Sequence, residues 1–239
     1  MLSSAVDRLT CHWPSQCGVC RQWGTRALCG DCVDRFASPV PRCTRCGLRL
    51  SLSLHSGLAG KVCGGCLRDP PAFVQTCCAV DYTFPWDHVI TAFKFEDRLD
   101  WAPALARLLL RSLPIELDVD LVVPIPLSDQ RRAERGYNQA WELARRAAAL
   151  RRLPARQDIL MRPWDTAHQA DLGRRERQQN LQRAFMVDAR QRHQLQGRRV
   201  ALVDDVMTTG ATAQEASSVL LRAGAHSVQV WVLARTEGH

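Results

Sequence analysis

Apolar residues of the last two thirds of the chain fall into two kinds of segment. Three segments are short and continuously apolar, as in parallel strands buried on both faces, and a fourth alternates like an edge strand; these are residues 120–126, 200–203, 228–234 and 79–84. Helical spacing of apolar residues predicts four helices, at residues 86–95, 101–113, 138–152 and 213–223. We therefore expect a doubly wound, mainly parallel α/β sheet with ligands at the carboxyl ends of its strands.

Two connecting segments lack this patterning. Residues 128–136 are predicted as a turn, and residues 163–196 form a polar stretch with little apolar content. A polar segment of that length inside a compact domain is usually functional or disordered. Two consecutive prolines at 70–71 mark a boundary. We therefore expect a first unit at residues 11–70 and a second, α/β unit at residues 77–239.

The first unit is dominated by cysteines. Eight of the 11 cysteines in the chain form four C-x-x-C pairs: Cys17/Cys20, Cys29/Cys32, Cys43/Cys46 and Cys63/Cys66. Two residues between cysteines let both thiolates face one metal, so the spacing predicts a small zinc-ribbon-like module with two structural Cys₄ zinc sites. A unit of about 60 residues has too little apolar surface to fold alone, and the metal would serve as its core.

The sharing of the two metals among the pairs stays open at this point. Sequential pairing gives two consecutive zinc ribbons, whereas the short spacer between Cys20 and Cys29 also allows interleaved pairing. Cys11 and His12 are candidate replacement ligands. Two further cysteines are expected to be buried in the first strand of the second unit, and these are Cys77 and Cys78.

Disulfide bonds and redox C-x-x-C pairs are the competing interpretations of the cysteines. A disulfide framework needs an oxidising compartment, and the N-terminal sequence has no apolar core long enough for a signal peptide. Four copies outside any βαβ unit argue against redox chemistry. No stretch approaches the roughly 18 continuous apolar residues of a membrane span. These observations predict a cytoplasmic protein without a membrane span.

Residues 199–212 combine a buried strand, two carboxylates, a hydroxyl-rich turn and a helix start. Free N–H groups at that helix start, together with the hydroxyls of Thr208, Thr209 and Thr212, would form a nest for a phosphate dianion. Gly210 allows close approach of the backbone. Asp204 and Asp205 would repel phosphate, so we expect them to accept hydrogen bonds from ribose hydroxyls, directly or through Mg²⁺. The alternatives are an ordinary strand-to-helix turn and an inherited loop that no longer binds.

Positive charge is concentrated in one part of the chain. The net charge is +8, whereas residues 131–199 hold 17 Arg and 7 acidic residues, a net of +10 that leaves −2 for the rest. A basic tract facing a phosphate site suits pyrophosphate, a nucleotide or nucleic acid. The alternative is a solvated Arg-rich face, which is what most charge runs are.

Residues 199–212 resemble the 5-phosphoribosyl-1-pyrophosphate (PRPP) motif of type I phosphoribosyltransferases over their whole length. Residues 123–140 end a neighbouring strand on the same side of the sheet, where a pyrophosphate loop is expected. The polar stretch would close over the site as a lid, and its relevant residues are Thr166, Gln169, Leu172, Arg175, Glu176, Arg177, Asn180 and Phe185. Together with the cysteine-rich start, these segments resemble the ComF/GntX family of competence-related proteins from Cys17 to Arg235.

The resemblance implies a type I phosphoribosyltransferase-like second unit and assigns roles to its residues. Asp204 and Asp205 would hold the ribose hydroxyls, with Mg²⁺ accompanying PRPP. The 5-phosphate would lie against five residues of the turn, namely Thr208, Thr209, Gly210, Ala211 and Thr212. Pyrophosphate or a nucleic-acid backbone would contact arginines of two segments, namely Arg131, Arg132, Arg135, Arg175 and Arg177.

One position departs from the family pattern. Family members often have a glycine shortly after the Lys-Phe that corresponds to Lys94 and Phe95, whereas Glu96, Asp97 and Arg98 follow here. The sequence therefore assigns Lys94 no role. Catalytic residues are likewise not assigned, because no aromatic hood for an acceptor base stands out beyond Trp141 or Trp164.

The resemblance implies a competence-type protein that supports uptake of transforming single-stranded DNA into the bacterial cytoplasm. PRPP or a related phosphoribosyl compound is the expected ligand, with single-stranded DNA and other competence proteins as partners. Two alternatives stay open: a phosphoribosyltransferase acting on an unidentified acceptor, and a sensor that binds PRPP or a nucleotide without turning it over.

Overall fold

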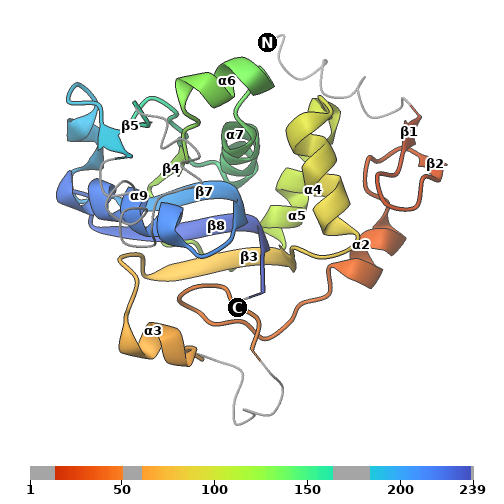
Figure 1. Cartoon of the computed structure of the whole chain (residues 1–239), viewed down its shortest axis with the longest axis horizontal. Coiled ribbons are helices and arrows are strands. Elements are labelled where there is room, and N and C mark those ends of the chain that lie inside the picture. Colours follow the sequence, from red (N-terminus) through yellow and green to blue (C-terminus); the bar gives the residue numbers. More distant parts are fainter. Residues whose placement is uncertain (1–13, 51–60, 164–183, 238–239) are drawn as a thin grey trace, which may run out of the picture.

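A four-stranded parallel sheet forms the centre of the computed structural model, which describes residues 14–50, 61–163 and 184–237 (Figure 1). The strand order is β3-β8-β7-β4, and each neighbouring pair is parallel. The strands are β3 (Gln75–Asp81), β4 (Leu121–Pro124), β7 (Arg199–Met207) and β8 (Ser227–Arg235). The predicted doubly wound parallel sheet is thus confirmed, with its first strand at an edge.

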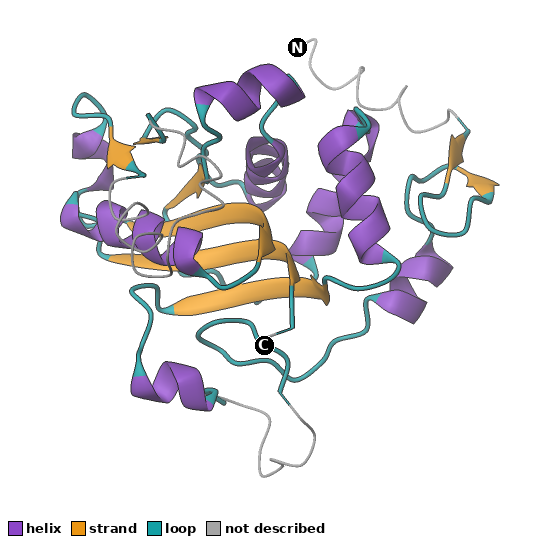
Figure 2. Cartoon of the chain, viewed as in Figure 1, coloured by secondary structure: helices purple, strands orange, loops and turns teal. Residues whose placement is uncertain are grey.

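Helices cover both faces of this sheet (Figure 2). On one face lie α4 (Trp86–Phe95), α5 (Ala102–Leu110) and α7 (Gln139–Arg151); α9 (Ala211–Arg222) lies on the other. A 3₁₀ turn, Leu99–Trp101, precedes α5. All four predicted helices are present: α4 has the predicted bounds, and the ends of the other three are shifted by one to three residues.

Two cores result from the alternation of side chains along each strand. Trp231 and Leu233 of β8 face the core formed with α4, α5 and α7, whereas Val230 and Val232 face the core formed with α9. All four side chains are fully buried. A strand covered on both sides has no polar face, which is why the sequence of β8 shows no alternation.

The segment at 128–136 is a helix, α6 (Asp129–Arg135), so its prediction as a turn is wrong. Ser128 caps its N-terminus through its side-chain oxygen, and Gly136 ends it with a positive φ of 72°. Serine before the first turn and glycine after the last are helix-end signals that were present in the sequence. They were overlooked because the helix exposes most of its surface and has no apolar periodicity.

The remaining elements are short. They are β1 (Ser15–Gln16), β2 (Trp23–Gly24), α2 (Gly30–Phe36), α3 (Gly64–Arg68), β5 (Leu160–Met161), β6 (Met186–Val187) and a 3₁₀ turn at Arg192–Leu195. Within the described ranges, no helix is both long and apolar enough to cross a membrane.

The cysteine-rich segment packs against the sheet at the edge strand β3. The backbone N–H of Thr76 donates to the carbonyl of Thr44 at 3.0 Å, and the Thr76 hydroxyl donates to the carbonyl of Arg45 at 2.6 Å. Arg42 and Arg49 form ion pairs with Asp81 at 2.6 and 3.0 Å. These contacts pair and cover backbone groups that would otherwise be open at the sheet edge.

The same segment also reaches α4 and α5. The indole N–H of Trp86 donates to the carbonyl of Phe36 at 2.7 Å, and Leu28 and Ala37 belong to the core beneath α4 and α5. Figure 1 shows the described chain that follows α2, up to residue 50, running beneath the sheet. The cysteine-rich segment therefore shares a core with the α/β unit.

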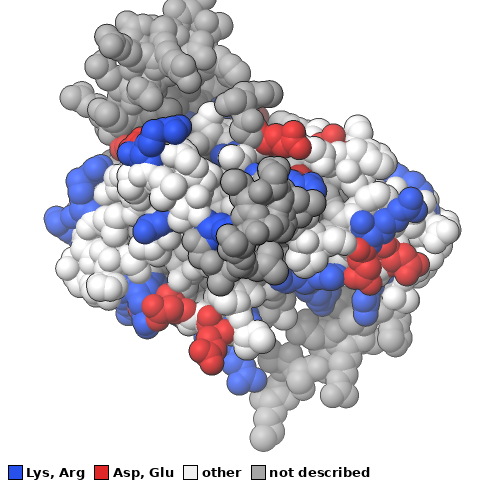
Figure 3. Space-filling view, turned by 90° about the horizontal axis from the view of Figure 1, so that it is seen from below, with Lys and Arg blue, Asp and Glu red and all other residues white. Residues whose placement is uncertain are grey.

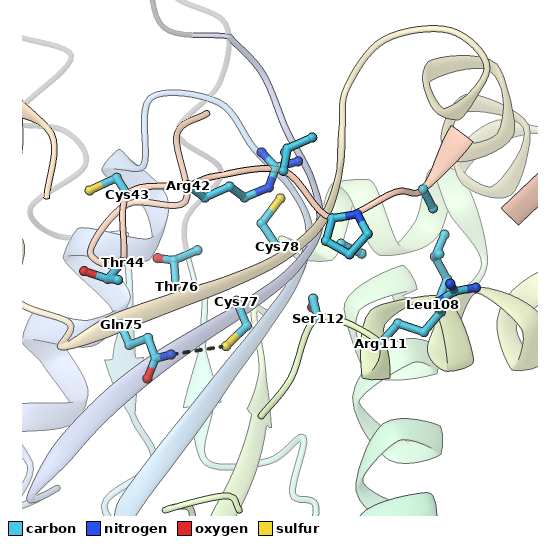
Figure 4. A pocket seen from close by; sticks show the side chains of 14 residues that line it. Arg42, Cys43, Thr44, Gln75, Thr76, Cys77, Cys78, Leu108, Arg111 and Ser112 are labelled. Carbon is cyan, nitrogen blue, oxygen red and sulfur yellow. Dashed lines mark hydrogen bonds between the residues drawn. The ribbon is translucent and has the colours of Figure 1, made fainter. Parts of the chain in front are cut away.

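A cavity of about 310 Å³ lies between this segment, β3 and α5. Figure 4 shows the side chains of Cys77 and Cys78 on opposite sides of β3, with the Gln75 amide directed at Cys77; the Gln75 nitrogen and the Cys77 sulfur are 3.8 Å apart. Burial raises the pKa of Cys77 to about 12 and that of Cys78 to about 11. Both cysteines are buried in the first strand as predicted, and they behave as small apolar side chains.

We predict that Gly47→Ala lowers the free energy of unfolding by about 2 kcal/mol. Gly47 has a φ of +70°, and an added Cβ would lie 2.9 Å from the Thr76 methyl group, so both backbone and packing would be strained. Urea unfolding measures the change.

The control is Gly24→Ala, because a Cβ at Gly24 meets no atom within 4 Å. Its effect should stay within about 0.5 kcal/mol. Equal stability of the two variants would contradict the docking of the Gly47 turn on β3.

Candidate functional site

The eight paired cysteines form two tetrads in the structure. One consists of Cys17, Cys20, Cys29 and Cys32, the other of Cys43, Cys46, Cys63 and Cys66, and in each the four Sγ atoms lie within 4.8 Å of one another. The pairing is therefore sequential, and the interleaved alternative is wrong. Cys11 and His12 lie outside the described residues.

The sulfur positions fit a tetrahedral metal. Four thiolates about 2.3 Å from a zinc ion lie roughly 3.8 Å from one another. The Cys20 and Cys29 sulfurs are 3.8 Å apart, and those of Cys46 and Cys63 are 3.7 Å apart. These separations are too long for a disulfide, whose sulfurs lie about 2.05 Å apart. Each tetrad can therefore hold a metal ion through four thiolates.

The pKa values of the thiols agree with this interpretation. Burial and the neighbouring thiols raise the pKa of Cys32 and Cys66 strongly. Burial also opposes ionisation of Cys17, yet backbone N–H groups lower its pKa to about 6. Four thiolates this close repel one another, and a bound divalent cation removes that repulsion.

The two carboxylates of the acid pair lie inside β7. The strand extends to Met207, with Asp204 paired to Val232 of β8, so the prediction that it stops at the acids is wrong. Successive residues of a strand point to opposite sides. Asp205 is almost fully buried and faces α4, and Asp204 is partly buried.

Lys94, at the end of α4, is the cation of the acid pair. Its Nζ lies 2.9 Å from Oδ1 of Asp205, and both side chains are largely buried. Burial and the charge of Asp205 raise the pKa of Asp204 to about 7, against the opposing charges of Lys94 and Arg162. The pair therefore shares less than two full negative charges near neutral pH.

The end of α4 is fixed by the chain that follows α6. The Tyr137 hydroxyl donates to the carbonyl of Phe93, and the Gln139 amide donates to the carbonyl of Lys94 at 3.2 Å. Asn138 donates to the carbonyl of Ile125 just beyond β4, at 3.0 Å. This network joins the carboxyl end of β4 to Lys94 and, through Lys94, to the acid pair.

The turn between β7 and α9 has the predicted features of an anion site. Thr208 and Thr209 are exposed, and Gly210 has a φ of +86° before the first residue of α9. In the part of the chain that the structure describes, the N–H groups of Thr208, Thr209, Gly210 and Thr212 donate to no other group. The Ala211 N–H donates to the Thr209 hydroxyl at 3.3 Å. Open donors and a helix start together can receive a phosphate.

The predicted basic residues divide into three groups. Arg131, Arg132 and Arg135 lie on α6, and no carboxylate of the described residues pairs with them. Arg175 and Arg177 lie outside the described residues, as do the predicted lid residues from Thr166 to Asn180. Five further arginines of the basic tract form ion pairs, and these are Arg145, Arg146, Arg156, Arg190 and Arg199. Much of the tract is therefore charge-compensated.

Two more observations limit the basic surface. On the face shown in Figure 3, the described basic side chains are scattered and lie beside acidic ones. Phe185, placed in the lid by the sequence, is buried in the core beside α9, with Arg162 stacked 5.5 Å from its ring centre. Among the predicted basic contacts, the three that lie within the described residues are the arginines of α6.

Sequence reasoning assigned no role to two residues of the site, Lys94 and Arg235. Lys94 is the last cation of an amphipathic helix, and such a cation normally lies in solvent near a helix C-terminus. Arg235 is the last residue of β8, after the apolar run Val230–Ala234, and lies buried against the β7–α9 turn. A charged residue that directly follows a buried apolar run was the signal available for Arg235.

Comparison with known proteins gives matches over most of the chain. It is 36% identical over 236 residues to the DNA utilization protein YhgH of Salmonella typhimurium, covering 93% of this chain and 98% of that protein. It is 35% identical over 236 residues to YhgH of Escherichia coli, with the same coverage. It is 34% identical over 215 residues to competence protein F of Haemophilus influenzae, covering 87% and 90% of the two chains. The chain belongs to the ComF/GntX family.

Other comparisons add little to this ComF/GntX assignment. No family model matches the chain. Among solved structures, the allosteric regulatory enzyme of purine biosynthesis gives a TM-score of 0.38 at 20% identity, covering 55% of this chain and 25% of that chain. TT1426 from Thermus thermophilus gives a TM-score of 0.33 at 16% identity, with coverages of 59% and 84%. TM-scores this low support no argument.

We predict that Asp204→Asn makes this ComF/GntX protein more stable by about 1–3 kcal/mol at pH 7.5. The folded pKa of Asp204 lies above its value in the unfolded chain, so its ionisation costs stability as pH rises from about 4 to 7. The gain from Asn should therefore be small at pH 4, grow up to pH 7 and then level off. Urea unfolding across this range measures it.

The control is Glu116→Gln, which removes an exposed carboxylate far from the site. It should change stability by less than about 0.5 kcal/mol at every pH. A stability gain for Asp204→Asn that does not vary with pH would contradict a carboxyl group strained by burial.

Proposed function

We propose that this protein is a competence-type factor that handles single-stranded DNA and binds PRPP or a related phosphoribosyl ligand at the β7–α9 turn. One observation carries the ligand proposal: the acid pair and the open N–H groups lie at the two ends of the same short segment. The relatives, by their names, act in DNA utilization and competence, which supports the biological part.

The geometry supports a definite pose for the ligand. The 5-phosphate would accept hydrogen bonds from the open N–H groups of residues 208–212 and from the threonine hydroxyls. The ribose hydroxyls would donate to Asp204 and Asp205, directly or through Mg²⁺, which would supply positive charge beside the diphosphate. Lys94 already neutralises part of the acid pair. A ligand there meets less repulsion than two free carboxylates would exert.

Zinc is the proposed metal of both cysteine tetrads. Four thiolates with tetrahedral spacing are typical of structural zinc sites, which keep no open position for a substrate. The two ions would hold together a segment that has few buried apolar side chains of its own. A transferase would release pyrophosphate from PRPP when an acceptor that takes the phosphoribosyl group is supplied, whereas a sensor would not, so a pyrophosphate assay with candidate acceptors distinguishes the two.

We predict that wild-type protein binds PRPP with Mg²⁺ and that the double variant Asp204→Asn, Asp205→Asn does not. The variant keeps the phosphate nest but loses both negative charges, and each Asn offers the ribose hydroxyls and Mg²⁺ one neutral oxygen in place of a carboxylate. Calorimetric titration measures binding, and elemental analysis should give two zinc ions per chain in both proteins.

Glu116→Gln serves again as the control and should bind PRPP like the wild type. Undiminished affinity in the double variant would show that the acid pair does not hold the ribose. If well-folded, zinc-loaded wild-type protein does not bind PRPP, the ligand proposal is wrong. The proposed contacts with DNA and with other proteins would then still stand.

A contact with single-stranded DNA is favoured by one aromatic side chain near the acid pair. Phe95 directly follows Lys94 and is 64% exposed, and the Arg135 guanidinium lies 4.7 Å from its ring centre. An aromatic face beside unpaired arginines is the combination with which proteins stack bases and follow a phosphate backbone. Arg131 and Arg132 extend this positive charge along α6.

We predict that replacing both Arg131 and Arg132 by Ala weakens binding of oligo-dT and reduces the salt dependence of the affinity by about 1–2 in slope. Two fewer phosphate contacts release fewer counterions. Phe95→Ala should instead lower the affinity by about 1–3 kcal/mol with an unchanged slope, because it removes stacking only. Fluorescence anisotropy at several salt concentrations measures both.

Phe84→Ala is the matched control, because Phe84 is also exposed but packs on Phe36 away from the site. It should leave the affinity unchanged, and Phe95→Ala should not affect an abasic oligonucleotide. An unaltered salt slope in the double arginine variant would contradict a nucleic-acid contact by α6.

A further inference from the structure

Arg235, the last residue of β8, connects the second cysteine tetrad to the β7–α9 turn. Its side chain is buried, with 6% of the residue exposed. Nε donates to the carbonyl of Cys46 at 3.1 Å. Nη1 donates to the carbonyl of Met207 at 3.2 Å and also to that of Thr208. One rigid guanidinium thus contacts a metal-ligand residue and the first two peptides of the turn.

These contacts determine which way the turn presents its N–H groups. In a trans peptide the carbonyl and the following N–H point in opposite directions. Arg235 draws the carbonyls of Met207 and Thr208 toward itself, so the N–H groups of Thr208 and Thr209 point away from it. Those N–H groups are two of the open donors of the turn. Arg235 therefore pre-organises the donors proposed to hold the phosphate.

The charge of Arg235 supports the same conclusion. In the described part of the chain, every hydrogen bond that its guanidinium donates goes to an uncharged oxygen, including the carbonyl of Thr236 at 3.0 Å. A buried cation without a carboxylate partner is costly unless an anion comes near. A phosphate on the far side of the turn would supply that negative charge, attracted through two peptides.

We propose that Arg235 is a positioning residue that couples the two sites, so that a metal in the Cys43–Cys66 tetrad and an anion on the β7–α9 turn stabilise each other. The metal fixes the Cys46 carbonyl, which fixes the guanidinium, which fixes the turn. Coupling of this kind is reciprocal: if the metal raises the affinity of the turn for the anion, the anion must raise the affinity of the tetrad for the metal by the same free energy. The anion part rests on the proposed phosphoribosyl ligand.

The test compares Arg235→Gln and Arg235→Lys with the wild type. Arg235→Gln removes the positive charge and the simultaneous contact with the Cys46 carbonyl and the turn, so the PRPP affinity should fall at least tenfold. Hydrogen exchange of the peptide spanning residues 207–212 should become faster. Arg235→Gln should also lose zinc more rapidly to a chromophoric chelator, and only from the Cys43–Cys66 tetrad. Alkylation of the freed thiols identifies the tetrad that has lost its zinc. Lys keeps the charge but cannot bridge, so it should recover part of the affinity without restoring slow zinc loss.

Arg49→Gln is the matched control. Arg49 belongs to the same cysteine-rich segment and contacts Asp81, but neither Cys46 nor the turn. It should leave affinity, exchange and zinc loss within about twofold of the wild type. If Arg235→Gln folds and leaves exchange and zinc loss unchanged, Arg235 does not couple the sites.

Two further outcomes are distinguishable. If wild-type protein does not bind PRPP, the proposed ligand is wrong, while exchange and zinc loss in the variants still decide whether Arg235 links tetrad and turn. If Arg235→Gln does not fold, the coupling is tested on the wild-type protein alone. Saturating PRPP should then slow zinc loss from the Cys43–Cys66 tetrad and not from the other, and equal rates with and without PRPP would overturn the coupling.

Discussion

A parallel strand that is covered on both faces has little room for charged side chains except toward its ends. β7 meets this constraint over Val200 to Val203, whose side chains are fully buried between helices on either side. Its carboxylates follow in the last residues, at the edge where β4 and β8 also end. Lys94 and Arg235 reach the same edge from α4 and β8. The acid pair of β7 and Arg235 of β8 thus lie at the carboxyl end of the sheet.

The constraint also explains the role of the cysteine-rich segment. β3 is an edge strand, and its outer backbone groups need partners. Thr44 and Arg45 provide them through Thr76, and each tetrad holds its loop in shape without a core of its own. The segment thus covers the outer edge of β3. Its Cys46 carbonyl also accepts a hydrogen bond from Arg235 at the end of β8. The cysteine tetrads and the β7–α9 turn therefore belong to one packed structure.

The sequence was most informative where one local rule applies. Continuous apolar runs identify β4, β7 and β8, and the C-x-x-C spacing identifies both tetrads, because each signal depends on neighbouring residues alone. It failed at α6, whose ends are marked by Ser128 and Gly136 but whose surface is exposed. The sequence also did not show which C-x-x-C pairs share a tetrad, and it gave no role to Lys94 or Arg235. Those depend on contacts between residues far apart in sequence, such as Lys94 and Asp205.

The contact between Cys46 and Arg235 spans 189 positions of the chain. At a synthesis rate of about 5–20 residues per second, roughly 10–40 s separate the appearance of these two residues. The cysteine loops can take up metal during that interval, since their ligands are close together in sequence. The turn at Thr208 emerges well before its guanidinium anchor. A metal bound at that stage would be in place before the last residue of β8 is made, and Arg235 would then dock on a cysteine loop that already has its final shape.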